Sequence, residues 1–314
     1  MKRIKNSFSI KNLENISGIK AHTIRIWEKR YNLLEPERTD TNIRRYSLDS
    51  LRKLLNITLL YNHGIKISKI ANLSEKEIPF LVREIALKSN SEQVSINAFK
   101  LSMVNFDITM FDATYDELLA KNEFNFIYLN IFVPLMSGLG ILWQTGAISP
   151  SHEHFITNLI KQKIHIQTEI MQRDSMPKIN ASTFVLYLPD NEIHELSILF
   201  INYFILSKGY KTILLGQSIP TMSLKTLLSY SPFLHFVTYV TVEPNKDEIN
   251  AYVKHFHKEL IESTENQLSI FGPQVKHIDK SLVEQGINVY DKIETFIEEQ
   301  LNVNVFVWLF SIFT

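Results

Sequence analysis

The stretch Leu186-Tyr-Leu-Pro-Asp-Asn-Glu-Ile-His-Glu-Leu-Ser197 decides how the second half of the chain is interpreted. Apolar, β-prone residues run from Thr183 to Leu188 and end at Pro189-Asp-Asn191, which is typical of a turn. An apolar helical pattern begins directly afterwards. This order predicts that His194 lies in or just after a strand-to-helix loop, at the edge where open α/β sheets bind ligands. Glu192 lies two residues earlier and is predicted to orient the imidazole.

The chain after Pro177 repeats this order of a β-prone segment followed by a helical pattern. Strands are predicted at residues 182–188, 211–215, 234–241, 267–271 and 287–290. Helices are predicted at residues 193–208, 222–229, 245–262, 274–285 and 291–301. Strands that alternate with crossover helices indicate a parallel, doubly wound sheet.

The segment ahead of this sheet is helical throughout. Helices are predicted at about residues 92–104, 108–121, 124–144 and 150–174, and a four-helix bundle is their natural packing. Gly138 and Gly140 indicate close packing or ligand approach, because glycine inside a helix costs about 1 kcal/mol relative to alanine. Trp143 closes one helix, and Glu153-His154 lies in the first turn of the next, so these side chains are predicted at one end of the bundle. A buried tryptophan and a glutamate favoured by the helix dipole also fit this pattern.

The charge of the chain is distributed unevenly along its 314 residues. Residues 1–60 hold 13 Lys and Arg against 6 Asp and Glu, which leaves +7 there and −7 over the rest. A basic head on an acidic body indicates a polyanionic partner for the head. The absence of cysteine excludes disulfides and thiolate chemistry, and it fits a reducing cytoplasm. No signal peptide and no membrane-spanning stretch is recognisable, so a cytoplasmic protein without a membrane partner is expected.

Residues 9–31 predict two short helices joined by a turn at Ser17-Gly18. The apolar positions of both helices are Ile10, Leu13, Ile16, Ile19, Ile24 and Trp27. Two short helices joined by a glycine-containing turn form a helix-turn-helix motif. Residues 35–46 predict a β-wing around the turn Thr39-Asp-Thr-Asn42, and a helix follows from Ser47 to about Asn62.

The segments Thr23-Ile-Arg-Ile-Trp-Glu-Lys-Arg-Tyr31 and Arg44-Arg-Tyr-Ser47, on either side of the wing turn, resemble the MerR family of winged-helix transcription regulators. The resemblance covers about residues 7–75 and implies binding to double-stranded DNA at a palindromic operator. The DNA-facing residues that it implies are Thr23, Arg25, Arg30, Tyr31, Arg38, Arg44 and Tyr46. Most of them are expected to contact phosphate, and Arg25 is expected to contact a base edge. A generic small helical domain with surface arginines is the alternative interpretation.

Three features together resemble the cobalamin-binding module, in which a four-helix cap lies over a flavodoxin-like sheet. They are Glu192-Ile-His194 after the first strand, Leu214-Leu-Gly-Gln-Ser-Ile-Pro220 in and after the second, and Trp143 with Glu153-His154 after a spacer of nine residues. With the basic head, they are similar to the CarH/LitR group of photoreceptor-type repressors in the MerR family. The implied fold is a winged helix-turn-helix, a four-helix bundle and a flavodoxin-like parallel sheet.

This resemblance implies cobalamin, most plausibly adenosylcobalamin, as the cofactor. It implies that His194 is the lower axial ligand of the cobalt, that Glu192 holds the imidazole, and that Trp143 and Glu153-His154 cover the upper face. The implied cofactor-binding residues are Trp143, Glu153, His154, Glu192, His194, Ser197, Gly216 and Gly272. The predicted domains are residues 1–75, a linker at 76–91, a bundle at 92–175, a sheet domain at 176–302 and an apolar tail without assigned role at 303–314.

Three positions depart from the pattern of that group. Ser197 and Pro273 stand where glycines are usual, and Gln144 follows Trp143 where a second imidazole would stand. These departures leave open a cofactor-free regulator with a degenerate pocket. A corrinoid-carrying methyltransferase subunit is a third, less favoured alternative. The leading hypothesis is a cobalamin-responsive repressor without enzyme activity that assembles as a dimer or tetramer, and the resemblance implies sensitivity to light.

Overall fold

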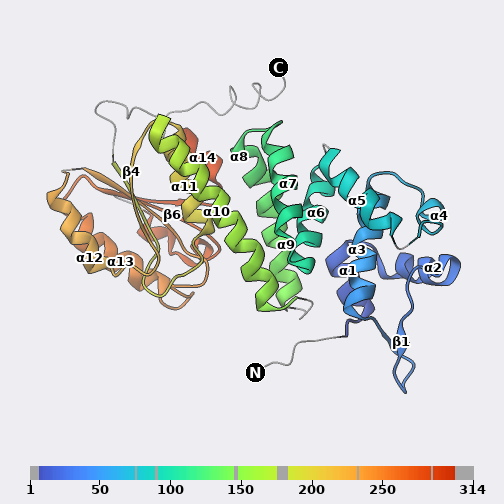
Figure 1. Ribbon diagram of the computed structural model, residues 1–314. Helices are drawn as coiled ribbons and strands as arrows, with labels where there is room; N and C mark the ends of the chain where they lie inside the picture. Colours follow the sequence, from blue (N-terminus) through green and yellow to red (C-terminus); the bar gives the residue numbers. More distant parts are fainter. Residues whose placement is uncertain are drawn as a thin grey trace. The chain divides into compact units, whose positions relative to one another are not determined.

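The computed structural model describes residues 7–74, 76–88, 91–144, 148–174, 183–231, 233–283 and 286–300 (Figure 1). The chain divides into two compact units, residues 1–160 and 161–314. Helix α10 (Pro150–Asp174) runs through the boundary between them. No helix among the described residues is long and apolar enough to cross a membrane.

The helix-turn-helix motif predicted for residues 9–31 is confirmed. Helix α1 (Ile10–Ser17) begins at Ser9, whose side chain accepts a hydrogen bond from the Asn12 N–H while the Asn12 side chain accepts from Ser9. Gly18 ends the helix with a φ of 76°, in the left-handed region that suits glycine. Helix α2 (Ala21–Tyr31) follows, and its apolar side buries Ile24 and Trp27.

The predicted wing is also present. Strands β1 (Glu37–Arg38) and β2 (Arg44–Arg45) pair antiparallel around a turn that closes at Asn42, which has a φ of 62°. Helices α3 (Leu48–Asn62) and α4 (Ile67–Ile70) come next. Ser47 caps α3 by accepting the Ser50 N–H, as the sequence signal indicated.

The linker predicted at residues 76–91 was expected to contain a short helix around Phe80 to Lys88, and the structure has a longer helix there. This helix, α5 (Glu77–Lys88), packs against α3. Its buried side chains are Ile78, Val82 and Ile85, spaced at helical intervals of three or four residues.

The predicted helices ahead of the sheet are confirmed. The first two are α6 (Glu92–Asn105) and α7 (Ile108–Leu119). The third is a continuous run of α8 (Phe124–Ile127), η1 (Tyr128–Phe132) and α9 (Val133–Gln144), and the fourth is α10. Phe99, Phe111 and Phe132 form an aromatic core, with ring centroids 4.9–6.3 Å apart. The π-helical turn η1 precedes Pro134, which has no N–H to donate within a regular helix.

The head and the bundle share one compact unit. Helix α3 packs against α6, and α1 packs against α9. The Nζ of Lys100 in α6 donates to the carbonyl of Ile16, in the last turn of α1, at 3.2 Å. A cation at a helix C-terminus also interacts favourably with the helix dipole. The helix-turn-helix motif is therefore packed directly on the bundle.

The second unit is the predicted parallel sheet. Its strands are β3 (Thr183–Tyr187), β4 (Lys211–Gly216), β5 (Leu234–Tyr239), β6 (Gln267–Phe271) and β7 (Ile287–Tyr290). They lie in the order β4-β3-β5-β6-β7, all parallel, which is the flavodoxin-like arrangement. The chain leaves β3 toward β4 on one side and returns to β5 on the other, so the switch point lies between β3 and β5.

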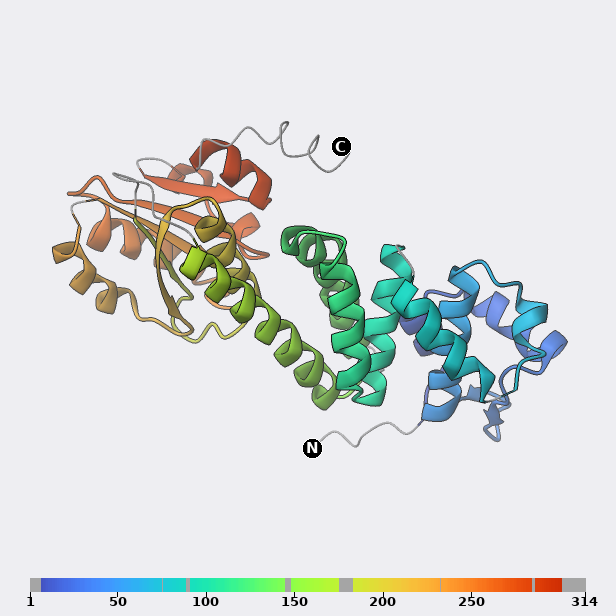
Figure 2. The same cartoon turned by 45° about the horizontal axis from the view of Figure 1, so that its top comes forward.

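Helices cover both faces of this sheet (Figures 1 and 2). Helices α11 (Leu196–Ser207) and α14 (Ile293–Gln300) lie on one face, and α12 (Thr221–Leu224) and α13 (Ile249–Leu260) lie on the other. Alternate residues of β3 face opposite ways, so Phe184 contacts Phe296 of α14 whereas Tyr187 stacks on Phe256 of α13.

Three helix predictions in this unit are wrong in their extent, and one of them, 245–262, begins four residues late as α13 at Ile249. The helix predicted at 274–285 is only two short 3₁₀ turns, η3 (Val275–His277) and η4 (Lys280–Leu282). The helix predicted at 193–208 begins at Leu196, so His194 lies in the preceding loop. The apolar tail 303–314 falls outside the described residues.

Candidate functional site

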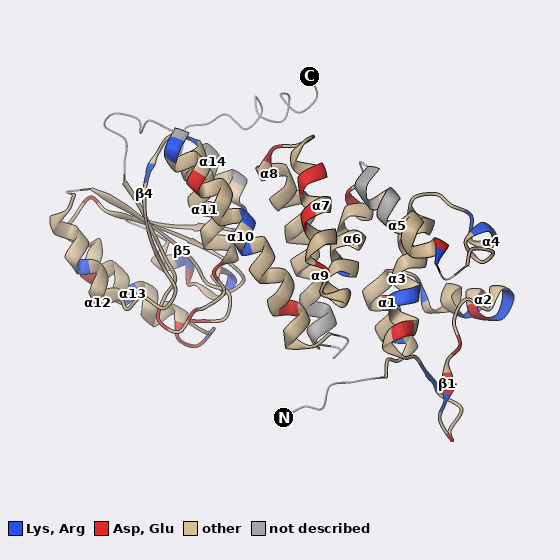
Figure 3. Ribbon diagram, in the orientation of Figure 1, with Lys and Arg blue, Asp and Glu red and all other residues tan. Residues whose placement is uncertain are grey.

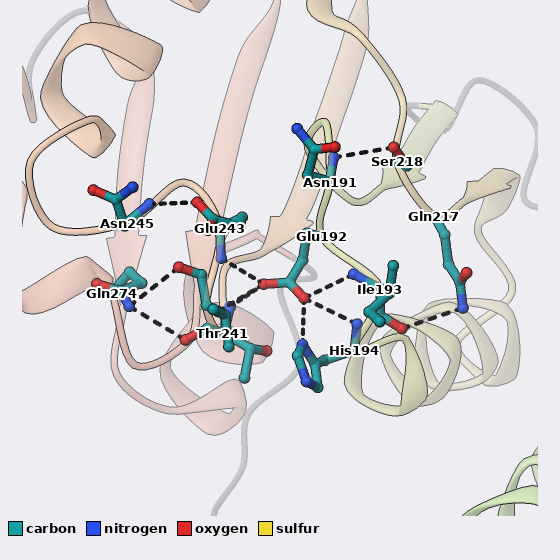
Figure 4. A network of polar contacts seen from close by, with 11 residues as sticks. Asn191, Glu192, Ile193, His194, Gln217, Ser218, Thr241, Glu243, Asn245 and Gln274 are labelled. Atoms are coloured by element: carbon teal, nitrogen blue, oxygen red, sulfur yellow. Dashed lines mark hydrogen bonds and ion pairs between the residues drawn. The ribbon is translucent and has the colours of Figure 1, made fainter. Parts of the chain in front are cut away.

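His194 lies in the loop between β3 and α11, at the carboxyl edge of the sheet (Figure 4). Its Nδ1 is 2.6 Å from Oε1 of Glu192, and half of its side chain is exposed. The same oxygen accepts the backbone N–H groups of Ile193 and His194, each at 2.9 Å. Among the residues that the structure describes, Nε2 of His194 has no hydrogen-bond partner. A neutral imidazole with its proton on Nδ1 would therefore present the Nε2 lone pair as a ligand.

The second carboxylate oxygen of Glu192 holds a different loop. Its Oε2 accepts the consecutive backbone N–H groups of Thr241, Val242 and Glu243, at 3.0, 2.7 and 3.0 Å. This loop follows β5, so Glu192 ties together the two loops at the switch point of the sheet. Sequence analysis expected Glu192 to orient the imidazole but did not foresee this second anchor.

The environment of Glu192 keeps it ionised. The side chain is 1% exposed. Burial alone would raise the pKa of this carboxyl, but the backbone N–H donors of Val242, His194 and Glu243 outweigh it, and the pKa is lowered to about 2. A permanent negative charge beside Nδ1 favours the tautomer that leaves Nε2 free.

The loop after β4 is fastened to the His194 loop. Oγ of Ser218 accepts the N–H of Asn191 at 3.0 Å and donates to Asp190 at 3.1 Å. The side-chain amide of Gln217 donates to the carbonyl of Ile193 at 3.2 Å. Three neighbouring loops thus hold His194 at one edge of the sheet (Figure 4).

The glycines predicted at the site differ in their surroundings. Gly272 has a φ of 109°, and a Cβ built there would lie 2.4 Å from the carbonyl oxygen of Val240, so no side chain fits. Gly216 has a φ of 85° with open space around it. Ser197 lies half-buried in the first turn of α11, and Pro273 is exposed. Nε2 of His194 and the surroundings of Gly216 are therefore both free of neighbouring protein atoms at this edge, among the described residues.

The predicted upper-face residues all belong to the first unit. Trp143 lies in the last turn of α9, and its side chain is outside the described part of the chain. Glu153 is half-buried and His154 is exposed, both in the first turn of α10. Sequence analysis overlooked their neighbour His152, which stacks on Phe106 with ring centroids 4.7 Å apart. The placement of these residues over His194 stays a prediction.

Lys and Arg residues of the head occur on α2 and the wing (Figure 3). Arg25 and Arg30 of α2 and Arg38 of β1 are exposed. The guanidinium of Arg30 lies 5.5 Å from the ring centroid of Tyr31, and Thr23 is half-buried on the same helix. These five predicted residues are accessible to a partner, although none is shown to contact DNA.

Two of the predicted DNA-facing residues have structural partners instead. Tyr46 is 1% exposed, and its hydroxyl donates to Oε2 of Glu28 at 3.1 Å, so the prediction of a DNA contact for it is wrong. Arg44 is half-buried, and its Nε contacts both oxygens of Glu28 at 3.0 and 3.2 Å. The carboxylate of Glu28 therefore fastens the wing to α2. The sequence did not predict this role of Glu28, because its partners Arg44 and Tyr46 lie 16 and 18 positions later in the chain.

Comparisons with known proteins identify the helix-turn-helix head and the helical bundle. Residues 8–77 match the family model of the MerR HTH family regulatory protein, and residues 95–167 match that of the B12 binding domain. The chain therefore carries a MerR-type helix-turn-helix domain followed by a B12-binding domain. These matches cover the head and most of the bundle.

Two curated proteins from Myxococcus xanthus are similar over most of the chain. The HTH-type transcriptional repressor CarH is 25% identical over 240 residues, which cover 74% of this chain and 78% of that protein. The HTH-type transcriptional repressor CarA is 21% identical over 218 residues, 69% of this chain and 70% of that protein. The Methanosarcina barkeri monomethylamine corrinoid protein has a similar fold, with a TM-score of 0.50 at 11% identity, over 74% of this chain and all of that one.

Proposed function

We propose that this protein is a DNA-binding transcriptional repressor whose activity responds to cobalamin. The observation that carries the proposal is His194, whose Nδ1 is held by a buried carboxylate and whose Nε2 is free, in a chain that begins with a MerR-type helix-turn-helix domain. The similarity to two HTH-type transcriptional repressors supports regulation rather than catalysis. The similar fold of a corrinoid protein supports the same ligand class for the sheet.

The residues at the sheet edge fit the group. His194 would hold the cobalt through Nε2, and Glu192 would hold the imidazole in the required tautomer. Bound cobalamin would supply a cobalt ion that accepts an imidazole nitrogen and, in its adenosyl form, a light-sensitive Co–C bond. Glu192 also keeps the loop at residues 241–243 in place, because its Oε2 accepts three N–H groups from that loop.

The head would bind duplex DNA through α2 and the wing. Exposed Arg30 and Arg38 can neutralise phosphates, which fixes the position of the protein without reading sequence, and exposed Arg25 would reach a base edge. Dimers or tetramers on a palindromic operator are part of the proposal, since helix-turn-helix proteins commonly bind paired half-sites. Cofactor binding would then shift the population toward one assembly.

The finer part of the proposal is the signal. Adenosylcobalamin is the proposed form, and light is the proposed trigger for release from DNA. Trp143, Glu153 and His154 are the residues proposed to line the space for the adenosyl group. The support is the resemblance of the Trp143 and Glu153-His154 spacing to photoreceptor-type repressors.

The test uses the full-length chain and three measurements. The protein is incubated with adenosylcobalamin in the dark and desalted, and its absorption spectrum is recorded before and after illumination. Binding is then measured to a duplex enriched from a random-sequence library by the same protein. His194→Ala should lose the cobalamin spectrum, whereas His255→Ala, at an exposed histidine of α13, should keep it.

Each outcome selects one hypothesis. A retained cobalamin spectrum with light-dependent DNA binding supports the whole proposal. A retained spectrum without a light effect contradicts only the proposed signal. Colourless protein that still binds DNA would establish the cofactor-free regulator. A retained cobalamin spectrum in protein that enriches no duplex would contradict the regulator and favour the carrier subunit instead.

A further inference from the structure

Ile26 is a large apolar residue in the middle of helix α2 with 51% of its surface exposed. Its neighbours Ile24 and Trp27 are buried, at 0% and 4%. Ile26 therefore lies on the side of α2 that faces away from the rest of the head, as the exposed Lys29 and Arg30 do. The DNA-facing residues predicted from the sequence do not include it.

The geometry of α2 places Ile26 at the centre of its outer face. At about 3.6 residues per turn, Ile26 points almost directly away from Ile24. Residues three and four positions away lie beside it on the same face, and these are His22, Thr23, Lys29 and Arg30. Thr23 is half-buried, and the other three are exposed. Ile26 is thus an apolar side chain between exposed His22, Lys29 and Arg30, and Figure 3 shows the blue of Lys and Arg on α2.

No carboxylate interrupts this face. The single acidic residue of α2 is Glu28, and its oxygens are engaged by Arg44 and Tyr46 on the wing side. A second copy of the chain would fit this face poorly, because a symmetric contact would place the same cations opposite one another. A polyanion with an apolar group at its centre is the complementary partner.

We propose that Ile26 is a specificity-determining residue that packs against the C5-methyl group of a thymine in the major groove. The inference rests on the proposed binding of DNA through α2. The thymine methyl is the apolar group that the major-groove edges of the bases present, and apolar side chains recognise it by contact. Lys29 and Arg30 would meanwhile reach phosphates on either side of the groove.

The experiment removes the methyl group from the DNA instead of changing the protein alone. A duplex is enriched from a random-sequence library by the full-length protein, and each thymine in a half-site is replaced in turn by deoxyuridine, which lacks only the C5-methyl. For the wild-type protein, one position should weaken binding about fourfold, as expected for one buried methyl group. Replacement at the symmetric positions of both half-sites should weaken it about fifteenfold.

Variants then identify the side chain. Ile26→Ala should bind the thymine duplex more weakly and show no further loss with deoxyuridine at that position. The matched control is Ile43→Ala, which truncates the exposed isoleucine of the wing (55% exposed) and should keep the full deoxyuridine effect. Because both residues are exposed, both variants should unfold at the wild-type temperature.

Three results would overturn the inference. They are deoxyuridine effects that are absent at every position, effects that survive in Ile26→Ala, or a changed oligomeric state of Ile26→Ala without DNA. The first two leave the proposed DNA binding intact, whereas failure to enrich any duplex contradicts DNA binding itself and the inference with it.

Discussion

Replacing Glu192 with glutamine should destabilise the sheet unit and remove a defined part of its pH dependence. The substitution keeps the shape of the side chain but removes the charge that accepts N–H groups from both loops. The side-chain NH2 of the glutamine would also point its hydrogens at the backbone N–H groups of one of the two loops. The loss is therefore expected at the switch point and not in the core of the sheet.

The magnitude follows from the pKa of Glu192. It lies at about 2 against an ordinary value of 4.5, and each unit corresponds to about 1.4 kcal/mol, so ionised Glu192 stabilises the fold by about 3 kcal/mol. Because the folded-state pKa is depressed, this stabilisation is fully present above pH 4.5 and is lost as the pH falls through 2. At pH 3 the wild-type protein should have lost about 2 kcal/mol of it.

The assay is hydrogen exchange measured by mass spectrometry at increasing urea concentrations, followed in peptides from β3 and β5. These peptides report the free energy of unfolding of the sheet unit separately from the first unit. Glu192→Gln should lower it by about 3 kcal/mol at pH 7 and should show a shallower decline between pH 5 and pH 3. Glu262→Gln, at an exposed carboxylate of the same unit, should match the wild-type protein. Equal free energies for Glu192→Gln and wild type at pH 7 would refute the reasoning.

Three further predictions concern single residues. Arg38→Ala should reduce the slope of log affinity for DNA against log salt by about 0.9, measured by fluorescence anisotropy, if Arg38 neutralises one phosphate. Tyr46→Phe should lower the free energy of unfolding of the first unit by about 1 kcal/mol in urea titration, because its hydroxyl donates to Glu28; a steeper loss in DNA affinity than in stability would contradict its structural role. Gly272→Ala should cost at least about 2 kcal/mol, since its φ of 109° and the nearby Val240 carbonyl exclude a Cβ, and a wild-type melting temperature would disprove this.

The sequence alone determined the order and type of nearly all elements. Short β-prone apolar segments, each followed by a helical pattern, predicted the strands β3 to β7 within a few residues. Helical periodicity predicted α6 to α10. These patterns are local, since each element must bury one face whatever it packs against. The position of His194 after β3 followed in the same way, because Pro189-Asp-Asn191 ends the strand at a known edge of the sheet.

Local patterns were insufficient where a residue's role depends on partners far along the chain. Tyr46 looked like a surface residue of the wing, but the fold buries it against Glu28, 18 positions earlier. The polar composition of residues 76–91 predicted a linker, but three buried side chains pack α5 against α3. Periodicity shows which side of an element is apolar, and it does not show what will cover the polar side.

The site shows the same division. The sequence predicted that Glu192 holds His194, two residues away, because that contact is local. Only the tertiary structure brought the N–H groups of residues 241–243, about fifty positions later, onto the second oxygen of Glu192. That contact exists because β5 lies next to β3 in the sheet, and strand order arises from long-range packing that no local pattern encodes.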